Sequence, residues 1–298
     1  MEPQVRTSFQ TTRPLDLFST LAAIEFGPSL TIQNADVWRA TRTPEGPATV
    51  HLQRVAETIE VEAWGPGATW AAAKAPSLCG EEDDATGFQP RHRVIADLHR
   101  RNPGLRLPRT TAVFEALVPA VLEQKVTTVE AKAGYRALVA ALGEPAPGPV
   151  RLTLPPSSQV LARTPYWAFH RFGVERRRAV VIIEAARSAN RLEEITNMDL
   201  PSAYRRLDAF PGVGPWTAAK VALVALGDPD AVPVGDYHLP HTVGYALEGT
   251  PRSSDERMLE LLDPYRGHRA RVIRLLMVSG IGAPRFGPRR PLRNIANN

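Results

Sequence analysis

The segment 200–247 constrains the fold more than any other part of the sequence. It contains the short sequence FPGVG at 210–214, with a helical pattern before it and another at 215–226 after it. Gly212 and Gly214 permit a positive φ and a close approach by another backbone. The segment therefore predicts two helices joined by a tight hairpin, with the N-terminal end of the second helix projecting from that hairpin.

Such a hairpin favours an anion. The first N–H groups of a helix have no partner within the helix, and the helix dipole is positive at that end. A phosphodiester is the natural anion for this geometry. Two glycines between helices are more often simple turn residues, so the pattern G-x-G does not identify a function by itself. The longer string FPGVGPWTAAK, followed by a loop and Asp236, is much more specific.

The first hundred residues have the pattern of an antiparallel sheet. Segments 36–43, 47–55 and 58–64 are short and rich in β-branched or aromatic residues, and polar or proline-containing turns separate them. Segments 67–75 and 91–101 have helical patterns, and we expect them to cover one face of the sheet. These features predict an α/β sheet unit before the helical part of the chain.

The rest of the chain has a helical pattern. Thr127 with Glu130 three residues later forms a capping-box signature. The fold class is therefore α+β, with a sheet domain at 1–108 and an all-helical domain at 109–298. The expected helices lie near 111–124, 127–143, 158–163, 165–171, 175–190, 200–208, 215–226, 237–247, 254–262 (capped by Ser253) and 265–279.

Composition excludes several classes of protein. The 298 residues carry 36 Lys and Arg against 31 Asp and Glu, a net charge of +5, which favours a polyanionic partner weakly. The single cysteine, Cys79, excludes an internal disulfide, a four-cysteine iron–sulfur cluster and a thiolate-rich zinc site. The N-terminus has no apolar signal region and no stretch is long and apolar enough for a membrane span. We expect a cytoplasmic protein with no membrane partner.

The string L-x-x-F-P-G-V-G-x-W-T-A, followed by a loop and Asp-Tyr, resembles the helix–hairpin–helix DNA glycosylase superfamily, most closely its bacterial DNA-3-methyladenine glycosylase II branch. The interval from Gly214 to Asp236 matches that family. The upstream FEALVPAVLEQKVT resembles the first glycosylase helix of the branch and the turn after it. The resemblance implies that the N-terminal sheet unit is similar to half of a TATA-binding protein.

The resemblance gives Asp236 the role of catalytic carboxylate. Cleavage of a glycosidic bond at deoxyribose passes through an oxocarbenium-like state, which a nearby carboxylate can stabilise while it orients water. An Asp before an apolar helical run is more commonly a helix cap. The two roles are compatible, and the matching hairpin favours catalysis.

The resemblance also places two aromatic residues in a base pocket. Trp216 and Tyr237 match pocket positions, where electron-rich rings can stack on a cationic alkylated purine; the alternative for each is core packing. Bifunctional lyases of the family carry Lys where this chain has Trp216, so a monofunctional enzyme is expected. Lys220 lies one turn later on the same helical face. It stands where the resembled enzyme has an aromatic residue, so it is a candidate base-binding residue. A surface or phosphate-contacting lysine is the favoured interpretation, and a lysine nucleophile displaced by one turn is the other alternative.

The chain departs from the family pattern at three further positions. Lys125 stands where the family has an apolar wedge residue, and it or its neighbour Gln124 is expected to fill the gap left by the flipped base; a solvated turn lysine is the alternative. Arg274 falls near another pocket aromatic, which implies a more polar base pocket. Phe18 is a candidate for the N-terminal pocket aromatic.

The hairpin is expected to bind both DNA and a monovalent ion. DNA contacts are assigned to Gly212, Val213, Gly214 and Thr217, together with the two turn residues 124 and 125. In relatives, hairpin carbonyls bind sodium or potassium, and the corresponding carbonyls here are those of Asp208, Phe210 and Val213. No cofactor is required for the reaction.

The resulting hypothesis is a monofunctional DNA glycosylase of base excision repair. It flips alkylated purines of the 3-methyladenine and 7-methylguanine type from damaged double-stranded DNA and hydrolyses them off, leaving an abasic site. A monomer associated with the nucleoid is expected. Basic runs at 176–178, 266–274 and 285–293 fit duplex binding, or form solvated helix faces. The alternatives are a non-catalytic helix–hairpin–helix DNA-binding protein and a bifunctional glycosylase/lyase that uses Lys220.

Overall fold

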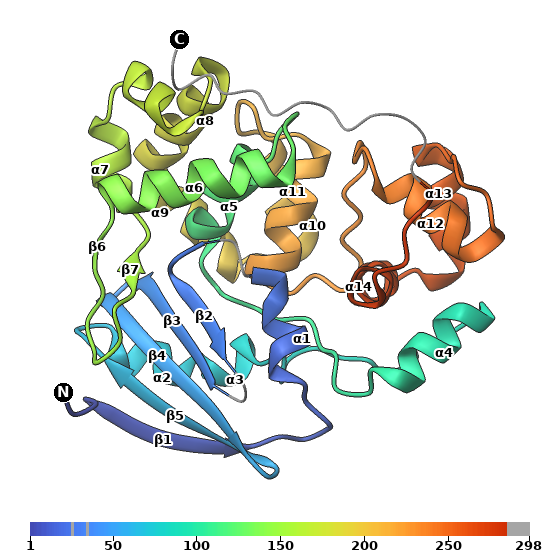
Figure 1. Cartoon of the computed structure of the whole chain (residues 1–298), viewed down its shortest axis with the longest axis horizontal. Helices are drawn as coiled ribbons and strands as arrows, with labels where there is room; N and C mark the ends of the chain where they lie inside the picture. Colours follow the sequence, from blue (N-terminus) through green and yellow to red (C-terminus); the bar gives the residue numbers. More distant parts are fainter. Residues whose placement is uncertain (25–26, 34–35, 285–298) are drawn as a thin grey trace.

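The computed structural model describes residues 1–24, 27–33 and 36–284 (Figure 1). A five-stranded antiparallel sheet lies at one end of the molecule, with the strand order β1-β5-β4-β3-β2. Helices fill the rest, so the predicted α+β class is confirmed. The basic run at 285–293 lies outside the described residues. The strands are β1 (Val5–Gln10), β2 (Leu30–Gln33), β3 (Asp36–Thr43), β4 (Gly46–Val55) and β5 (Thr58–Trp64), with a small second sheet of β6 (Glu144–Pro145) and β7 (Thr153–Leu154).

The helices follow the predicted segments closely after residue 110. The capping box of Thr127 and Glu130 is present, whereas the cap of the helix near 254–262 is Ser254 and not Ser253. The helices are α1 (Leu17–Leu21), α2 (Ala68–Ala73), α3 (Ala75–Leu78), α4 (Arg93–Arg101), α5 (Val113–Leu122), α6 (Thr128–Leu142), α7 (Ser158–Arg163), α8 (Arg176–Arg187), α9 (Ala189–Glu193), α10 (Leu200–Asp208), α11 (Pro215–Val221), α12 (Leu239–Glu248), α13 (Asp255–Leu262) and α14 (Arg269–Ser279). The 3-10 segments are η1 (Ala22–Ile24), η2 (Tyr166–Phe172), η3 (Glu194–Asn197) and η5 (Asp263–Tyr265), and η4 (Ala222–Leu226) is a π-helical continuation of α11.

The sheet buries one face against α1, α2 and α3. Alternate residues of β4 and β5, such as Val50, Leu52 and Val61, are buried there, as the period of two in a half-buried strand requires. Leu21 of α1 lies in the same core, which ties α1 to the sheet. Strands β1 and β2 were not expected from the sequence; they pair at the two edges of the predicted meander.

A second core lies among the central helices α5 to α11. Its largest fully buried side chain is Phe169 of η2, and it includes residues of α5, α6, α8 and α11. Glu193 of α9 caps α5 because its two carboxylate oxygens accept the N–H groups of Val113 and Phe114, at 2.9 and 2.8 Å. This core holds α10 and α11, the two helices that the hairpin joins.

A third core joins α4 to α12, α13 and α14. Ile95 and Leu98 of α4 pack with Val272 and Leu276 of α14 (Figure 1). The expectation that segment 91–101 covers the sheet is therefore wrong. The amphipathic stripe of this helix is real, but a stripe of apolar residues does not specify its partner.

A buried ion pair connects the sheet side of the molecule to α14. The two terminal nitrogens of the Arg271 guanidinium, Nη2 and Nη1, donate to the Asp83 carboxylate at 2.5 and 3.0 Å. Both side chains are almost fully buried. Asp83 comes from the charged loop after α3, so this loop has a structural function. Within the described residues, no helix is long and apolar enough to cross a membrane.

Candidate active site

The hairpin between α10 and α11 has the predicted form. Gly212 has a φ of +85°, and a Cβ there would lie only 2.3 Å from Cγ2 of Val181 on α8. Both constraints require glycine. Gly214 has an extended backbone, with φ −107° and ψ −177°, so this glycine does not use the positive φ that its lack of a side chain permits. A Cβ on Gly214 would meet open space, which leaves the hairpin surface accessible to another molecule.

Gln124 connects the hairpin to the turn after α5. Its Nε2 donates to the Gly212 carbonyl at 2.9 Å and to Oγ1 of Thr217 at 3.0 Å. Thr217 is buried, and its hydroxyl accepts this bond. The side chains of Gln124 and Thr217 thus hold the hairpin in place, and any contact of Thr217 with DNA would have to use its backbone N–H.

Lys125 lies at the exposed tip of the turn between α5 and α6. Its φ is +58°, an unusual value for a residue with a side chain. The neighbouring Gln124 is bound to the hairpin, so Lys125 is the residue of this pair that is free to reach outward. The assignment of Lys125 as the wedge stays a prediction.

Asp236 lies beside the start of α11 and the start of α12. One oxygen, Oδ2, accepts a hydrogen bond from Nε1 of Trp216 at 2.9 Å. The other, Oδ1, accepts the backbone N–H groups of His238 and Leu239, at 2.8 and 2.9 Å. Asp236 therefore accepts N–H groups at the start of α12, although the N-cap residue of this helix is His238, and three donors orient its carboxylate next to the hairpin helix.

Trp216 also contacts Lys220 one helical turn later. The Lys220 ammonium lies 5.1 Å from the centroid of the Trp216 ring. The same ammonium forms an ion pair with the Glu123 carboxylate, which is about nine-tenths buried at the end of α5. Lys220 is thus engaged with two neighbours within the protein.

Glu123 was not expected from the sequence to belong to the site. It is 97 residues from Lys220 along the chain, and no local pattern links the two. Both residues line a cavity of about 100 Å³ between η1, β3, α5 and α11. The only available signal was an acidic residue next to the turn at 124–127, and most glutamates in such places simply face solvent.

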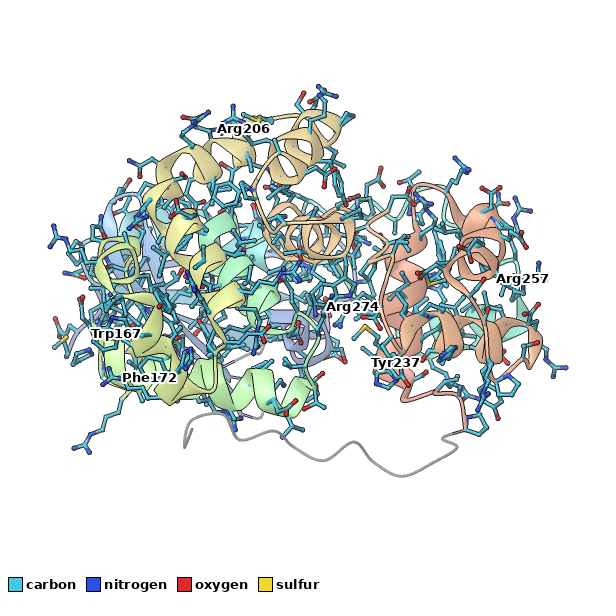
Figure 2. The ribbon with its side chains drawn as sticks, turned by 90° about the horizontal axis from the view of Figure 1, so that it is seen from above. Trp167, Phe172, Arg206, Tyr237, Arg257 and Arg274 are labelled. Atoms are coloured by element: carbon cyan, nitrogen blue, oxygen red, sulfur yellow. The ribbon has the colours of Figure 1, made fainter. Side chains whose placement is uncertain are left out.

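Tyr237 is 80% exposed and lies beside Asp236 in sequence. Its ring packs edge-on against His238 with centroids 4.8 Å apart. Figure 2 shows Tyr237 and Arg274 on the side of the C-terminal helices that faces the central helices. An exposed ring at this place is not core packing, which was the alternative for Tyr237.

Arg274 is buried between α14 and α1. Its guanidinium donates to the Ser19 carbonyl at 2.8 Å, and burial lowers its pKa to about 10. Its Nε has no hydrogen-bond partner among the described residues. Phe18, the residue before Ser19, is 58% exposed. The pocket roles of Arg274 and Phe18 stay predictions; the observed contact of Arg274 is with α1.

The three hairpin carbonyls expected to bind an ion occupy the end of α10 and the hairpin. The Phe210 carbonyl accepts the N–H of Val213 at 3.0 Å and keeps a second lone pair. Asp208 is the last residue of α10, where helix carbonyls lack donors within the helix. Among the described residues, no cluster of His, Cys, Asp and Glu suits a metal ion.

The two described basic runs are only partly exposed. Arg176 and Arg177 are exposed at the start of α8, whereas Arg178 is buried and donates to the Leu122 carbonyl at 2.7 Å. In the second run, Arg266, Arg269 and Arg271 pair with the acidic residues Asp263, Asp230 and Asp83. The second run therefore contributes less free positive charge than the sequence indicates.

No family model matches the chain. In sequence it is 36% identical, over 160 residues, to a protein of Mycobacterium tuberculosis (strain H37Rv) named probable bifunctional transcriptional activator/DNA repair enzyme AlkA; the match covers 52% of this chain and 31% of that protein. It is 32% identical to DNA-3-methyladenine glycosylase 2 of Escherichia coli (strain K12) over 180 residues, 59% of this chain and 61% of that enzyme. The match thus spans about a third to three-fifths of these relatives.

The fold is similar to that of a solved structure, the 3-methyladenine DNA-glycosylase from Archaeoglobus fulgidus. The TM-score is 0.76 at 21% sequence identity, and the superposition covers 92% of this chain and 98% of that one. Since the superposition covers 92% of this chain, the likeness extends over both the sheet and the helical part.

Proposed function

We propose that the chain is a member of the helix–hairpin–helix DNA glycosylase superfamily, to whose members it is similar in sequence and fold, and that it is a monofunctional DNA glycosylase that excises alkylated purines and leaves an abasic site. The observation that carries this proposal is the Asp236 carboxylate, which three donors orient beside the start of the hairpin helix. The names of the two sequence relatives, a DNA repair enzyme and a 3-methyladenine glycosylase, support the same activity.

The hairpin would hold the DNA. The first-turn N–H groups of α11, including those of Trp216 and Thr217, have no acceptor within their own helix and suit a phosphate. Gly214 presents no side chain on that surface. Exposed Lys125, Arg176 and Arg177 lie on elements that contact the hairpin through Gln124 and Val181, and they add positive charge for the duplex.

Asp236 would then act on the flipped nucleotide. Its carboxylate stabilises positive charge at C1′ as the glycosidic bond breaks and orients the attacking water. Trp216 holds Oδ2 through Nε1, and the backbone of α12 holds Oδ1. With these three donors bound, the remaining lone pairs of the Asp236 carboxylate can contact substrate and water. Tyr237 would stack on the extruded base.

The lyase alternative conflicts with the contacts of Lys220. A lyase needs an amine with a free lone pair to attack C1′. The Lys220 nitrogen is an ammonium paired with Glu123 and lies over the Trp216 ring. Because both contacts hold this nitrogen against neighbouring side chains of the protein, hydrolysis is the better-supported reaction.

The hairpin carbonyls of Asp208, Phe210 and Val213 would hold a sodium or potassium ion. Carbonyl oxygens are suitable donors for such an ion, and it would add positive charge next to the phosphate site. No other cofactor is part of the proposed reaction. The enzyme would act on damaged double-stranded DNA as a monomer in the cytoplasm, in association with the nucleoid.

An oligonucleotide assay separates these possibilities. The protein is incubated with a duplex that carries one 7-methylguanine, and strand cleavage is measured with and without alkali, relative to an enzyme-free duplex treated in the same way because alkali alone attacks 7-methylguanine. We expect cleavage only after alkali treatment, and no covalent adduct after borohydride reduction. Adduct formation that disappears in Lys220→Met would establish the lyase instead. Binding without any abasic product, in wild type and in Asp236→Asn alike, would establish the non-catalytic alternative.

A further inference from the structure

A cation of the protein itself lies over the ring face of Trp216. The Lys220 ammonium lies 5.1 Å from the ring centroid, within the range of a cation–π contact. The Lys220 side chain is 34% exposed, so part of it is accessible to another molecule. The partner of Lys220, Glu123, is 11% exposed and fixes the ammonium from the other side.

This arrangement changes which bases the site can select. An open tryptophan face attracts a cationic base through the ring quadrupole. Where an ammonium occupies that ring, a cationic base gains less from the ring and is repelled by the like charge. A neutral purine escapes this repulsion, and an acceptor on its edge, such as O6 or N7, can accept a hydrogen bond from the remaining ammonium donors.

We propose that Lys220, held by Glu123, is a specificity-determining residue that lowers the preference of the site for cationic alkylpurines relative to neutral modified purines with an acceptor edge. The inference rests on the proposed glycosylase function and concerns the substrate class of the same site. Glu123 acts by positioning the ammonium and by partly neutralising it. Relative to a site with an unoccupied Trp face, the preference for cationic bases is reduced.

The test is a competition assay that measures the release of two damaged bases in one reaction. Duplexes with a single 7-methylguanine, which is cationic and has a blocked N7, compete with duplexes with a single hypoxanthine, which is neutral and has free O6 and N7 acceptors. The readout is the ratio of kcat/KM for the two bases, 7-methylguanine over hypoxanthine. A ratio is insensitive to the fraction of folded enzyme, so a partly destabilised variant still gives a result.

Lys220→Met should raise this ratio by roughly 3- to 30-fold, the range that a cation–π contact is worth. Glu123→Gln should lower the ratio, because it leaves the ammonium in place without its counter-charge. Lys220→Arg keeps a cation that can lie over the Trp216 ring and should leave the ratio within about twofold of wild type. Lys74→Met, at the junction of α2 and α3 on the sheet side, is the matched control for loss of a lysine.

Failure of the specificity proposal and failure of the proposed glycosylase function give different results. Release of both bases with a ratio that Lys220→Met leaves unchanged or lowers would overturn the specificity role and leave the glycosylase function standing. An equal loss of both products in Lys220→Met would show a structural role only. Release of neither base by the wild-type protein would overturn the proposed function itself.

Discussion

The residues of the candidate site divide into those that would face a substrate under the proposed function and those that hold the first group in position. Asp236 is accessible beside the hairpin, and the indole N–H of Trp216 fixes one of its oxygens. Gln124 holds the hairpin and is itself occupied. The sequence pattern predicted Asp236 and Trp216 together because their spacing from the glycines is a local property of the chain, and in the structure the two side chains are hydrogen-bonded.

Trp216→Phe tests the positioning function of the indole. Phenylalanine keeps an aromatic ring but cannot donate to Asp236. A hydrogen bond to a charged group is worth about 1.5–3 kcal/mol, so we expect kcat to fall by roughly 10- to 100-fold while KM changes little. Steady-state kinetics on a methylated duplex measures the split. A rise of KM with unchanged kcat would show that Trp216 acts only in binding.

Other residues of the site were not predictable in the same way. The partners of Lys220 and Arg274 come from α5 and α1, far away in the chain. The side-chain types alone indicated a polar pocket, whereas the structure shows a buried Arg274 bound to a carbonyl. Such pairings depend on how helices approach one another, and a single sequence carries no local signal for that.

At the scale of elements, the hairpin depends on two glycines for different reasons. Gly212 combines a positive φ with contact to Val181, and Gly214 is extended and faces open space. The sequence pattern treated the two as equivalent, because glycine spacing does not reveal backbone angles.

The amphipathic pattern likewise predicted α4 as a helix but assigned it to the wrong core.

The two glycines give a matched pair of variants. Gly212→Ala should lower the free energy of unfolding by about 1–3 kcal/mol, because alanine is strained at a φ of +85° and would clash with Val181. Gly214→Ala should leave stability nearly unchanged but weaken DNA binding, since its methyl group projects where a phosphate would approach. Urea unfolding and fluorescence anisotropy with a duplex measure the two effects. Equal destabilisation by both variants would contradict this account.

At the scale of the whole molecule, three cores are connected by ion pairs that involve α14. Arg271 reaches Asp83 after α3, and Arg269 reaches Asp230 in the loop after η4. These contacts place α14 and α12, and with them Tyr237, relative to the hairpin. A domain boundary at 108/109 stays a prediction; α4, which precedes it, packs with the C-terminal helices.

The Asp230 contact predicts how stability depends on pH. Burial by itself would raise the pKa of Asp230, but hydrogen bonds from Arg269 and Gly267 outweigh it and lower the pKa below the ordinary 3.8. A carboxyl whose pKa is depressed by folding stabilises the protein above its unfolded pKa and loses that contribution as the pH falls through the folded value.

Asp230→Asn should therefore cost about 1–3 kcal/mol of unfolding free energy near neutral pH. The difference from wild type should shrink as the pH falls below 3.8. Denaturant unfolding across the acid range measures it, with Asp263→Asn, which affects the exposed pair with Arg266, as the control. A difference that stays constant down to the lowest pH would contradict the depressed pKa.

The central claim is that Asp236 supports hydrolytic release of a damaged base. The most direct measurement is mass spectrometry of the bases released from methylated genomic DNA by wild-type protein and by Asp236→Asn, with duplex affinity measured in parallel. We expect free modified purines from the wild type, almost none from Asp236→Asn, and similar DNA binding by both. Near-normal base release by Asp236→Asn would contradict the claim.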